Sequence, residues 1–265
     1  MARGYSAVRM WHPSLDVPRG LISTFSAVNK FGRTTNADSG VATDIHDGAN
    51  ATDDLDVWVA PTAARVHQIA STQAADDGNP VGVGARTLRV YGLTGWGTEE
   101  VSEDITLNGV GDVPTVNSYV IIHRMKVLTK GGTNVNVGVI TATADTNGTV
   151  TAQINAGQGQ TQMAIYGIPS TQTAFICNYY ASAIKNAAAV RVAVALLVNP
   201  EPDAELTKFL VKHTNGLDST GTSYINHPFN PFFAVAGPAI IKVQVNASAA
   251  DTDVSGGFDL VLVTN

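Results

Sequence analysis

The chain has 265 residues, of which 44% are apolar and 14% charged, and its net charge is −6. This length and apolar content allow a sizeable core, but the charged fraction is well below the roughly 25% typical of soluble domains. No Lys/Arg cluster could neutralise a row of phosphates, which argues against direct nucleic-acid binding, and no apolar stretch reaches the roughly 18 residues that span a bilayer. We expect a weakly charged surface that packs against copies or partners, with an ordinary secreted β protein as the alternative.

Residues 1–55 show no sustained period of 2 or 3.6 and are rich in Gly, Asp, Asn, Thr and Ala. They lack the long apolar segment of a signal peptide, so we expect none. This composition predicts an extended N-terminal arm that lies against a neighbouring subunit. The domain at residues 56–265 is expected to fold without it.

From residue 56 onward, segments with alternating apolar and polar residues are separated by Gly, Asn, Asp and Pro at intervals of 8–12 residues. This spacing is typical of sandwiches and barrels. The predicted strands are residues 56–60, 64–70, 86–93, 101–109, 117–129, 136–144, 149–154, 160–169, 171–184, 188–199, 204–214, 239–248 and 258–263.

Three stretches of this pattern carry more specific expectations. Asn147-Gly148 separates two Val- and Thr-rich runs and predicts a hairpin turn with positive φ. Residues 201–210 are predicted as a strand, with one or two helical turns as the alternative. Residues 225–238 contain three prolines and predict a loop or an edge strand.

Catalytic motifs are missing from the sequence. No Ser lies in a G-x-S-x-G pattern, the six His are scattered, and Gly82-Val83-Gly84 precedes a strand where a phosphate loop would follow one. The single cysteine, Cys177, lies among apolar neighbours and is expected to be a small core residue. We therefore predict no enzyme, no catalytic residue and no cofactor.

Acidic residues gather in several turns, but none matches the spacing of a calcium-binding loop. Turn-forming Asp side chains are the expectation and a structural Ca²⁺ the alternative, so no metal ligand is assigned. Paired carboxylates for glycosidic cleavage remain open, because such pairs meet only in space. The acidic residues concerned are Asp44, Asp47, Asp53, Asp54, Asp56, Asp76, Asp77, Asp251 and Asp253, and, near one strand, Glu99, Glu100, Glu103 and Asp104.

Trp96 is the one candidate contact residue, because it lies in the predicted turn TGWGTEE. An exposed Trp on a loop can stack on a sugar or anchor in the pocket of a partner. Folding back onto its own sheet is the alternative.

Several segments together resemble a family of virion structural proteins of tailed bacteriophages, many from marine hosts. They include NKFGRTTNADSG, DIHDG, VAPTAARVHQIAST, GARTLRVYGL, EDITLNG, IHRMKVLTKG and TAQINAGQGQTQMAIYGIPSTQTAFI. The pattern runs over roughly residues 29–265 and contains no catalytic signature, so it transfers no functional residue. The resemblance implies a particle component at the head or the tail, located in the virion.

We therefore predict an all-β chain: an antiparallel, jelly-roll-like β-sandwich with an extended N-terminal arm. The predicted function is a non-enzymatic capsid-associated decoration or fibre component, or a tail component. Its expected partners are copies of itself and other virion proteins such as the major capsid or tail proteins. A host-surface glycan-binding module is the alternative, and a virion-borne polysaccharide hydrolase a weaker one.

Overall fold

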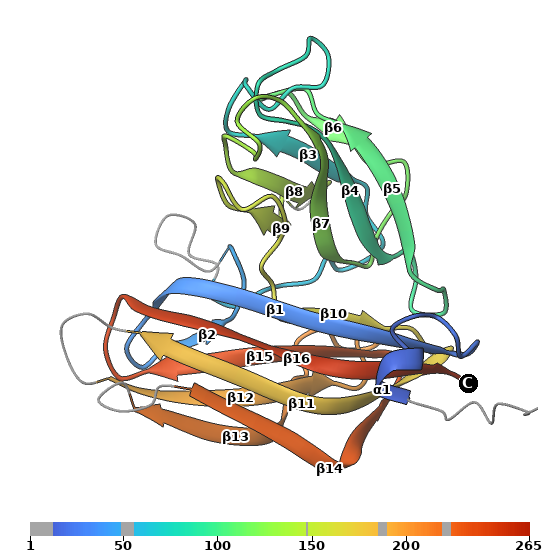
Figure 1. Ribbon diagram of the computed structural model, residues 1–265, viewed down its shortest axis with the longest axis vertical. Coiled ribbons are helices and arrows are strands. Elements are labelled where there is room, and N and C mark those ends of the chain that lie inside the picture. Colours follow the sequence, from blue (N-terminus) through green and yellow to red (C-terminus); the bar gives the residue numbers. More distant parts are fainter. Residues whose placement is uncertain (1–12, 49–55, 147, 185–189, 219–223) are drawn as a thin grey trace, which may run out of the picture.

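The computed structural model describes residues 13–48, 56–146, 148–184, 190–218 and 224–265. Apart from one short helix, α1 (Pro13–Asp16), its regular elements are strands, and every pair of named strands is antiparallel. The strands form two stacked parts, which we call the base and the head (Figure 1). The predicted all-β, antiparallel fold is confirmed, while the jelly-roll topology stays a prediction.

The base contains two facing sheets. The first has the order β1-β16-β11-β14, and the second has the order β10-β15-β12-β13 with β2 also paired to β15. In β16, residues 254, 258, 260 and 262 face a core that the second sheet closes, whereas Ser255, Asp259, Val261 and Val263 are more exposed. The strands are β1 (Phe25–Ala37), β2 (Ala42–Asp44), β10 (Ile165–Ile168), β11 (Gln172–Ile184), β12 (Arg191–Asn199), β13 (Leu210–Asp218), β14 (Tyr224–Ala236), β15 (Ala239–Ala247) and β16 (Thr252–Thr264).

The head is inserted between β2 and β10 of the base, and it also has two sheets. Their orders are β6-β3-β8-β9 and β5-β4-β7. Apolar residues such as Leu88, Val90 and Ile140 form a second core between them. The strands are β3 (His67–Ser71), β4 (Ala85–Leu93), β5 (Val101–Thr106), β6 (Val113–Pro114), β7 (Ile121–Lys130), β8 (Ile140–Ala144) and β9 (Val150–Ile154).

The head and the base share apolar packing where they meet. Ile165 of β10 and Ile240 of β15 belong to the core of the head, although their strands belong to the base. Gly167 of β10 lies so close to Ile121 that an added Cβ would be 2.8 Å from its Cγ2. The two parts are therefore in tight side-chain contact.

The expected extended arm is wrong for residues 25–44. β1 runs along β16 from Phe25↔Val263 to Ala37↔Thr252, with a register shift near its end, and β2 pairs with β15. Asp44 at the end of β2 is fully buried, and its carboxylate lies 2.7 Å from Nζ of Lys242. Because the partners of these strands lie more than 190 residues away in the sequence, no local pattern identifies which segments pair.

Other local predictions had mixed outcomes. Gly148 has the positive φ expected of the hairpin between β8 and β9, while Asn147 lies outside the described residues. β14 occupies an edge of its sheet, as the three prolines predicted. Residues 56–60 are not a strand. In place of strand pairing, the Trp58 amide donates to the Asp44 carboxylate, and the indole N–H of Trp58 donates to the carbonyl of Thr151.

The strand predicted at residues 201–210 is also wrong for its first nine residues, which form turns. The amide of Glu205 donates to the carbonyl of Glu201 over 2.8 Å, which is one helix-like turn. The side chain of Asn199 caps the same segment, accepting from Glu201 N and donating to Glu205 O. These local hydrogen bonds compete with strand pairing.

Candidate functional site

The outer face of the β1-β16-β11-β14 sheet is apolar at one end. Side chains alternate along a strand, so the residues that face away from the core of the base come together on this surface. Phe25, Phe175, Phe232, Val261 and Val263 line a hollow of about 780 Å³, together with Cys177 of β11. We call this surface the apolar face.

The chain just before β1 borders the same hollow. Ser14, Val17 and Ile22 contribute to its lining, and α1 lies beside this end of the sheet (Figure 1). The cover is incomplete, because Phe232 remains 56% exposed, Phe25 39% exposed and Leu15 54% exposed. Large apolar side chains gathered and exposed in this way usually mark an interaction surface.

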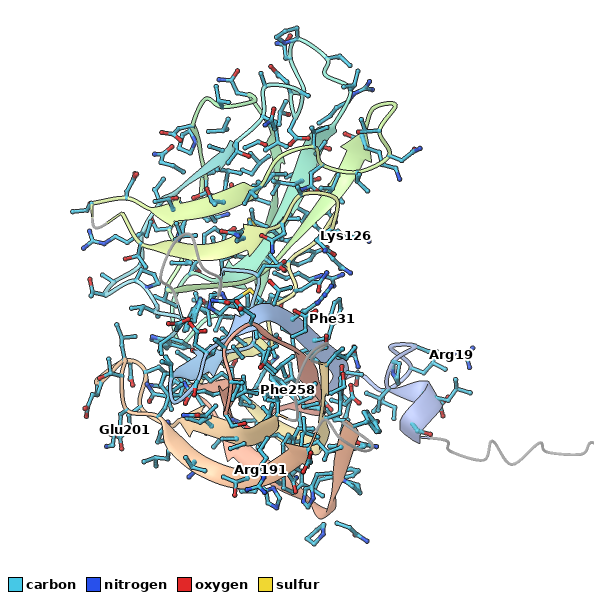
Figure 2. The ribbon with its side chains drawn as sticks, turned by 90° about the vertical axis from the view of Figure 1, so that its left-hand side faces the viewer. Arg19, Phe31, Lys126, Arg191, Glu201 and Phe258 are labelled. Carbon is cyan, nitrogen blue, oxygen red and sulfur yellow. The ribbon has the colours of Figure 1, made fainter. Side chains whose placement is uncertain are left out.

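A second hollow, of about 370 Å³, lies where β1 of the base meets β4 and β7 of the head. We call it the charged cavity. Figure 2 shows Phe31, which lines it, at the boundary between the two parts, with Phe258 inside the base. The other side chains that matter below are Lys30, Tyr91, Glu100, His123, Arg124 and Tyr166.

Lys30 is the unusual residue of the charged cavity. It occupies an inward-facing position of β1, is only 8% exposed, and donates from Nζ to the carbonyl oxygen of His123. Among the described residues, no carboxylate lies within ion-pair distance of Nζ. Burial and the neighbouring Arg124 lower the pKa of Lys30 to about 7, against a smaller opposing effect of Glu100.

Glu100 and His123 form a hydrogen-bonded pair at the same cavity, with 2.6 Å between Oε2 and Nε2. Burial lowers the pKa of His123 despite this bond. Burial alone would raise the pKa of Glu100, but the bond to His123 and nearby charges outweigh it and lower the pKa. At neutral pH the pair is therefore a carboxylate and a neutral imidazole, with the hydroxyl of Tyr166 3.4 Å from the carboxylate.

The acidic residues do not come together as a metal site. The described residues contain no group of three His, Cys, Asp or Glu side chains arranged to hold a metal ion. Asp44 pairs with Lys242, and Asp47 accepts hydrogen bonds from the amide of Gln162 and the side chain of Asn155. Asp76 accepts from three backbone amides and from Ser71, whereas Asp53 and Asp54 lie outside the described residues.

Each of the acids near β5 has its own hydrogen-bond or ion-pair partner. Glu99 accepts from Thr171 and Gln172, and Asp104 forms an ion pair with Arg89. Glu103 accepts from the Val116 and Asn117 amides and the Tyr119 hydroxyl.

Trp96 is half-buried against the core of the head and lines a separate hollow of about 300 Å³ beside Pro202 and Leu206. Its backbone carbonyl accepts from Ser170 N over 2.7 Å, so this turn joins the head to the base. This packing of Trp96 agrees with the alternative that its side chain folds back onto its own sheet. A sugar or partner contact at Trp96 stays a prediction.

Cys177 is not the core residue that the sequence suggested. It is half-buried and lines the apolar face, where burial and Asp259 raise the pKa of its thiol. Separately, none of the helices in the described ranges has the length and apolar character needed to cross a bilayer.

Sequence reasoning missed both hollows, because their residues come from distant segments. The charged cavity combines residue 30 with residues 91, 100, 123, 124 and 166. One signal was present: Lys30 follows Val28 and precedes Gly32 at two-residue spacing, so a strand there would turn the lysine inward. That signal required recognising β1 within the expected arm.

No protein-family model matches the chain, and the search of curated proteins found no match. Two solved structures show weak similarity. The VP2 subviral particle of infectious bursal disease virus gives a TM-score of 0.23 at 9% identity, covering 92% of this chain and 73% of that chain. T=1 particles derived from infectious bursal virus give 0.20 at 10% identity, covering 91% and 70%. TM-scores at this level do not establish a shared fold.

Proposed function

We propose that this chain is a non-enzymatic structural protein of a tailed-bacteriophage virion, which assembles with copies of itself and with other virion proteins. The observation that carries the proposal is the apolar face, a hollow lined by Phe and Val side chains that the chain itself covers only in part. Its place is a capsid-associated decoration or fibre, or a tail component. The sequence resemblance to phage virion proteins supports this assignment.

The occupant of the apolar face is a second copy of the chain. None of the residues that line the hollow is charged. In a symmetric dimer the same patch meets itself, and a neutral apolar patch does so without like-charge repulsion. Burying it removes apolar surface from water at roughly 25 cal/mol per Å².

The separate partners of Glu99, Glu103 and Asp104 support the non-enzymatic part of the proposal. Most glycosidases use a pair of carboxyl groups that flank the scissile bond. These three acids instead connect loops and strands of the protein.

Self-association can be tested by analytical ultracentrifugation of the full chain and of Phe232→Asp. Wild type is expected to form dimers or larger assemblies, and Phe232→Asp to weaken them by at least about tenfold, because a carboxylate would be buried in an apolar contact. Tyr224→Asp is the matched control, an aromatic residue of the same strand that is equally exposed but outside the hollow. A wild type that stays monomeric, or equal effects of both variants, contradicts this interface.

The virion assignment has its own test. Gradient-purified phage particles should contain the chain when they are analysed by mass spectrometry. Its absence from intact particles rules the assignment out, whatever the oligomeric state of the purified protein.

A further inference from the structure

The charged cavity carries more positive than negative charge. Among the groups that line it, Arg124 and Lys30 are cationic when protonated, Glu100 is the one carboxylate, and His123 is neutral. The carboxylate of Glu100 is already bonded to His123 and Tyr166. Neither Lys30 nor Arg124 has an ion-pair partner within the described part of the chain.

Arg124 is held in place but keeps free donors. Its Cζ lies 5.5 Å from the centre of the Tyr91 ring, and Nη2 donates to Oε1 of Gln160 over 3.2 Å. A guanidinium has five N–H donors in a planar fork that suits a carboxylate. Among the described residues no second acceptor bonds this guanidinium, so its remaining donors are available to an anion.

The rest of the cavity suits a sugar ring. Phe31, Tyr91 and Tyr166 form the aromatic wall. Arg124 lies over the Tyr91 ring and the Tyr166 ring packs against His123, so Phe31, which is 37% exposed, is the ring best placed to stack on a ligand. Aromatic faces stack on pyranose rings, while polar side chains of Gln160 and Thr161 can bond hydroxyl groups. Small-ligand pockets commonly start at about 300 Å³, and this cavity is slightly larger.

We propose that the charged cavity binds a uronic-acid sugar unit, with its carboxylate held by Arg124 and Lys30 and its ring against the aromatic wall. An anion there would supply the counter-ion that the ammonium form of Lys30 lacks, and would so favour the protonated lysine that burial otherwise disfavours. The same chemistry is offered by a free uronate and by the terminal unit of an acidic polysaccharide. The proposal does not rest on self-assembly, since the cavity and the apolar face share no residue.

Isothermal titration calorimetry of the full chain with D-glucuronate tests this site, with D-glucose and acetate as probes that lack the charge or the ring. Glucuronate is expected to bind at least about tenfold more tightly than either, because only it uses both the cations and the aromatic wall. Equal binding of glucose removes the role of the cations. Equal binding of acetate reduces the cavity to a general anion site, and no binding at millimolar concentration overturns the proposal.

Variants locate the binding. Arg124→Gln and Lys30→Met should each weaken glucuronate by at least about tenfold. Because Lys30 is buried, Arg124→Gln is the decisive variant if Lys30→Met fails to fold. Arg191→Gln, an exposed arginine on β12 far from the cavity in Figure 2, is the control and should bind as wild type. Unchanged binding by Arg124→Gln places the sugar elsewhere and contradicts the proposal.

Two further measurements are needed. One distinguishes a free uronate from the end of an acidic polysaccharide as the ligand, and the other separates sugar binding from self-assembly. A uronate oligosaccharide that binds more tightly than the monomer indicates a polysaccharide end, and equal affinity indicates the free sugar acid. Phe232→Asp should bind glucuronate normally, so loss of assembly and loss of sugar binding can be told apart.

Discussion

At the scale of single residues, Asp76 connects three segments of the head. Its Oδ1 accepts from the amides of Ala85 and Val137, both over 2.8 Å, and its Oδ2 accepts from Gly138 N and Ser71 Oγ, both over 2.7 Å. The side chain is fully buried, so no water replaces it easily. One carboxylate thus satisfies donors from loops that are far apart in sequence.

Asp76→Ala is expected to destabilise the protein by about 3 kcal/mol or more, because each buried donor left without a partner costs about 1–3 kcal/mol. Asp76→Asn, which keeps one acceptor oxygen, should lie in between. Asp77→Ala is the control, since the Asp77 carboxylate accepts an exposed hydrogen bond from the amide of Asn79. Urea denaturation gives the free energies of unfolding, and similar losses for Asp76→Ala and Asp77→Ala would show that the buried bonds contribute little.

Asp47 gives the protein a pH dependence of defined sign. Burial raises the pKa of this carboxyl to about 7, although hydrogen bonds from Gln162 and Asn155 oppose the shift. Between about pH 4 and pH 7 the folded protein thus holds a proton that the unfolded chain has released. This contribution to stability is complete below pH 4 and is lost as the pH rises to 7.

Asp47→Asn mimics the protonated acid, so wild type should become less stable relative to this variant as the pH rises from about 4 to 7. The expected change is a few kcal/mol, at about 1.4 kcal/mol per pKa unit. His67, whose pKa burial lowers to about 4, acts in the opposite direction over this range. The difference between the two proteins in denaturation at several pH values therefore isolates Asp47, and a constant difference would refute the assignment.

At the scale of elements, the N-terminal part of the chain has two roles: the residues before Phe25 border the apolar face, and the strands from Phe25 onward belong to the base. Residues 14–22 border the apolar face, whereas β1 and β2 complete the two sheets of the base. Deleting β2 also leaves Lys242, which is 2% exposed, without Asp44. Removing one partner of a buried ion pair costs about 3–5 kcal/mol.

A protein that lacks the N-terminal part and begins at residue 25 should therefore fold, and a protein that begins at residue 56 should not. Circular dichroism measures the difference: a native β spectrum with a cooperative melt is expected for the first protein only. The protein that begins at residue 25 should also bind a hydrophobic dye more strongly than wild type, because the deletion uncovers more of the apolar face. A folded protein starting at residue 56 would restore the independent arm that the sequence suggested.

At the scale of the whole molecule, the contact between head and base is a packed apolar joint that also forms the walls of the charged cavity. A Cβ on Gly167 would lie 2.8 Å from Ile121 Cγ2 and 3.3 Å from Leu93 Cδ1. Because cores tolerate little added volume, this glycine sets how closely the two parts approach.

Gly167→Val should destabilise the protein by about 1–3 kcal/mol through overpacking. It should also weaken glucuronate binding, because the walls of the cavity come from both parts. Gly132→Ala is the control, since nothing lies within 4 Å of the added Cβ. Thermal denaturation and calorimetry measure the two effects, and a Gly167→Val protein with wild-type stability would show that the joint is loose.

The sequence alone determined the properties that are set locally. Alternation of side chains identified most strands, Gly148 the positive φ of one hairpin, and the prolines the edge position of β14. The few charges predicted a neutral surface, which agrees with the uncharged lining of the apolar face. These features depend on neighbours within a few residues, so they can be read along the chain.

Only the tertiary structure decided that β1 belongs to a sheet, that the head is inserted into the base, and that Lys30 meets Arg124. Each of these depends on which distant surfaces fit together. A strand shows its alternation in the sequence, but its partner is chosen by packing and backbone pairing with segments that one local pattern does not contain. The apolar face and the charged cavity both form where distant segments pack together, so no sequence motif predicts them.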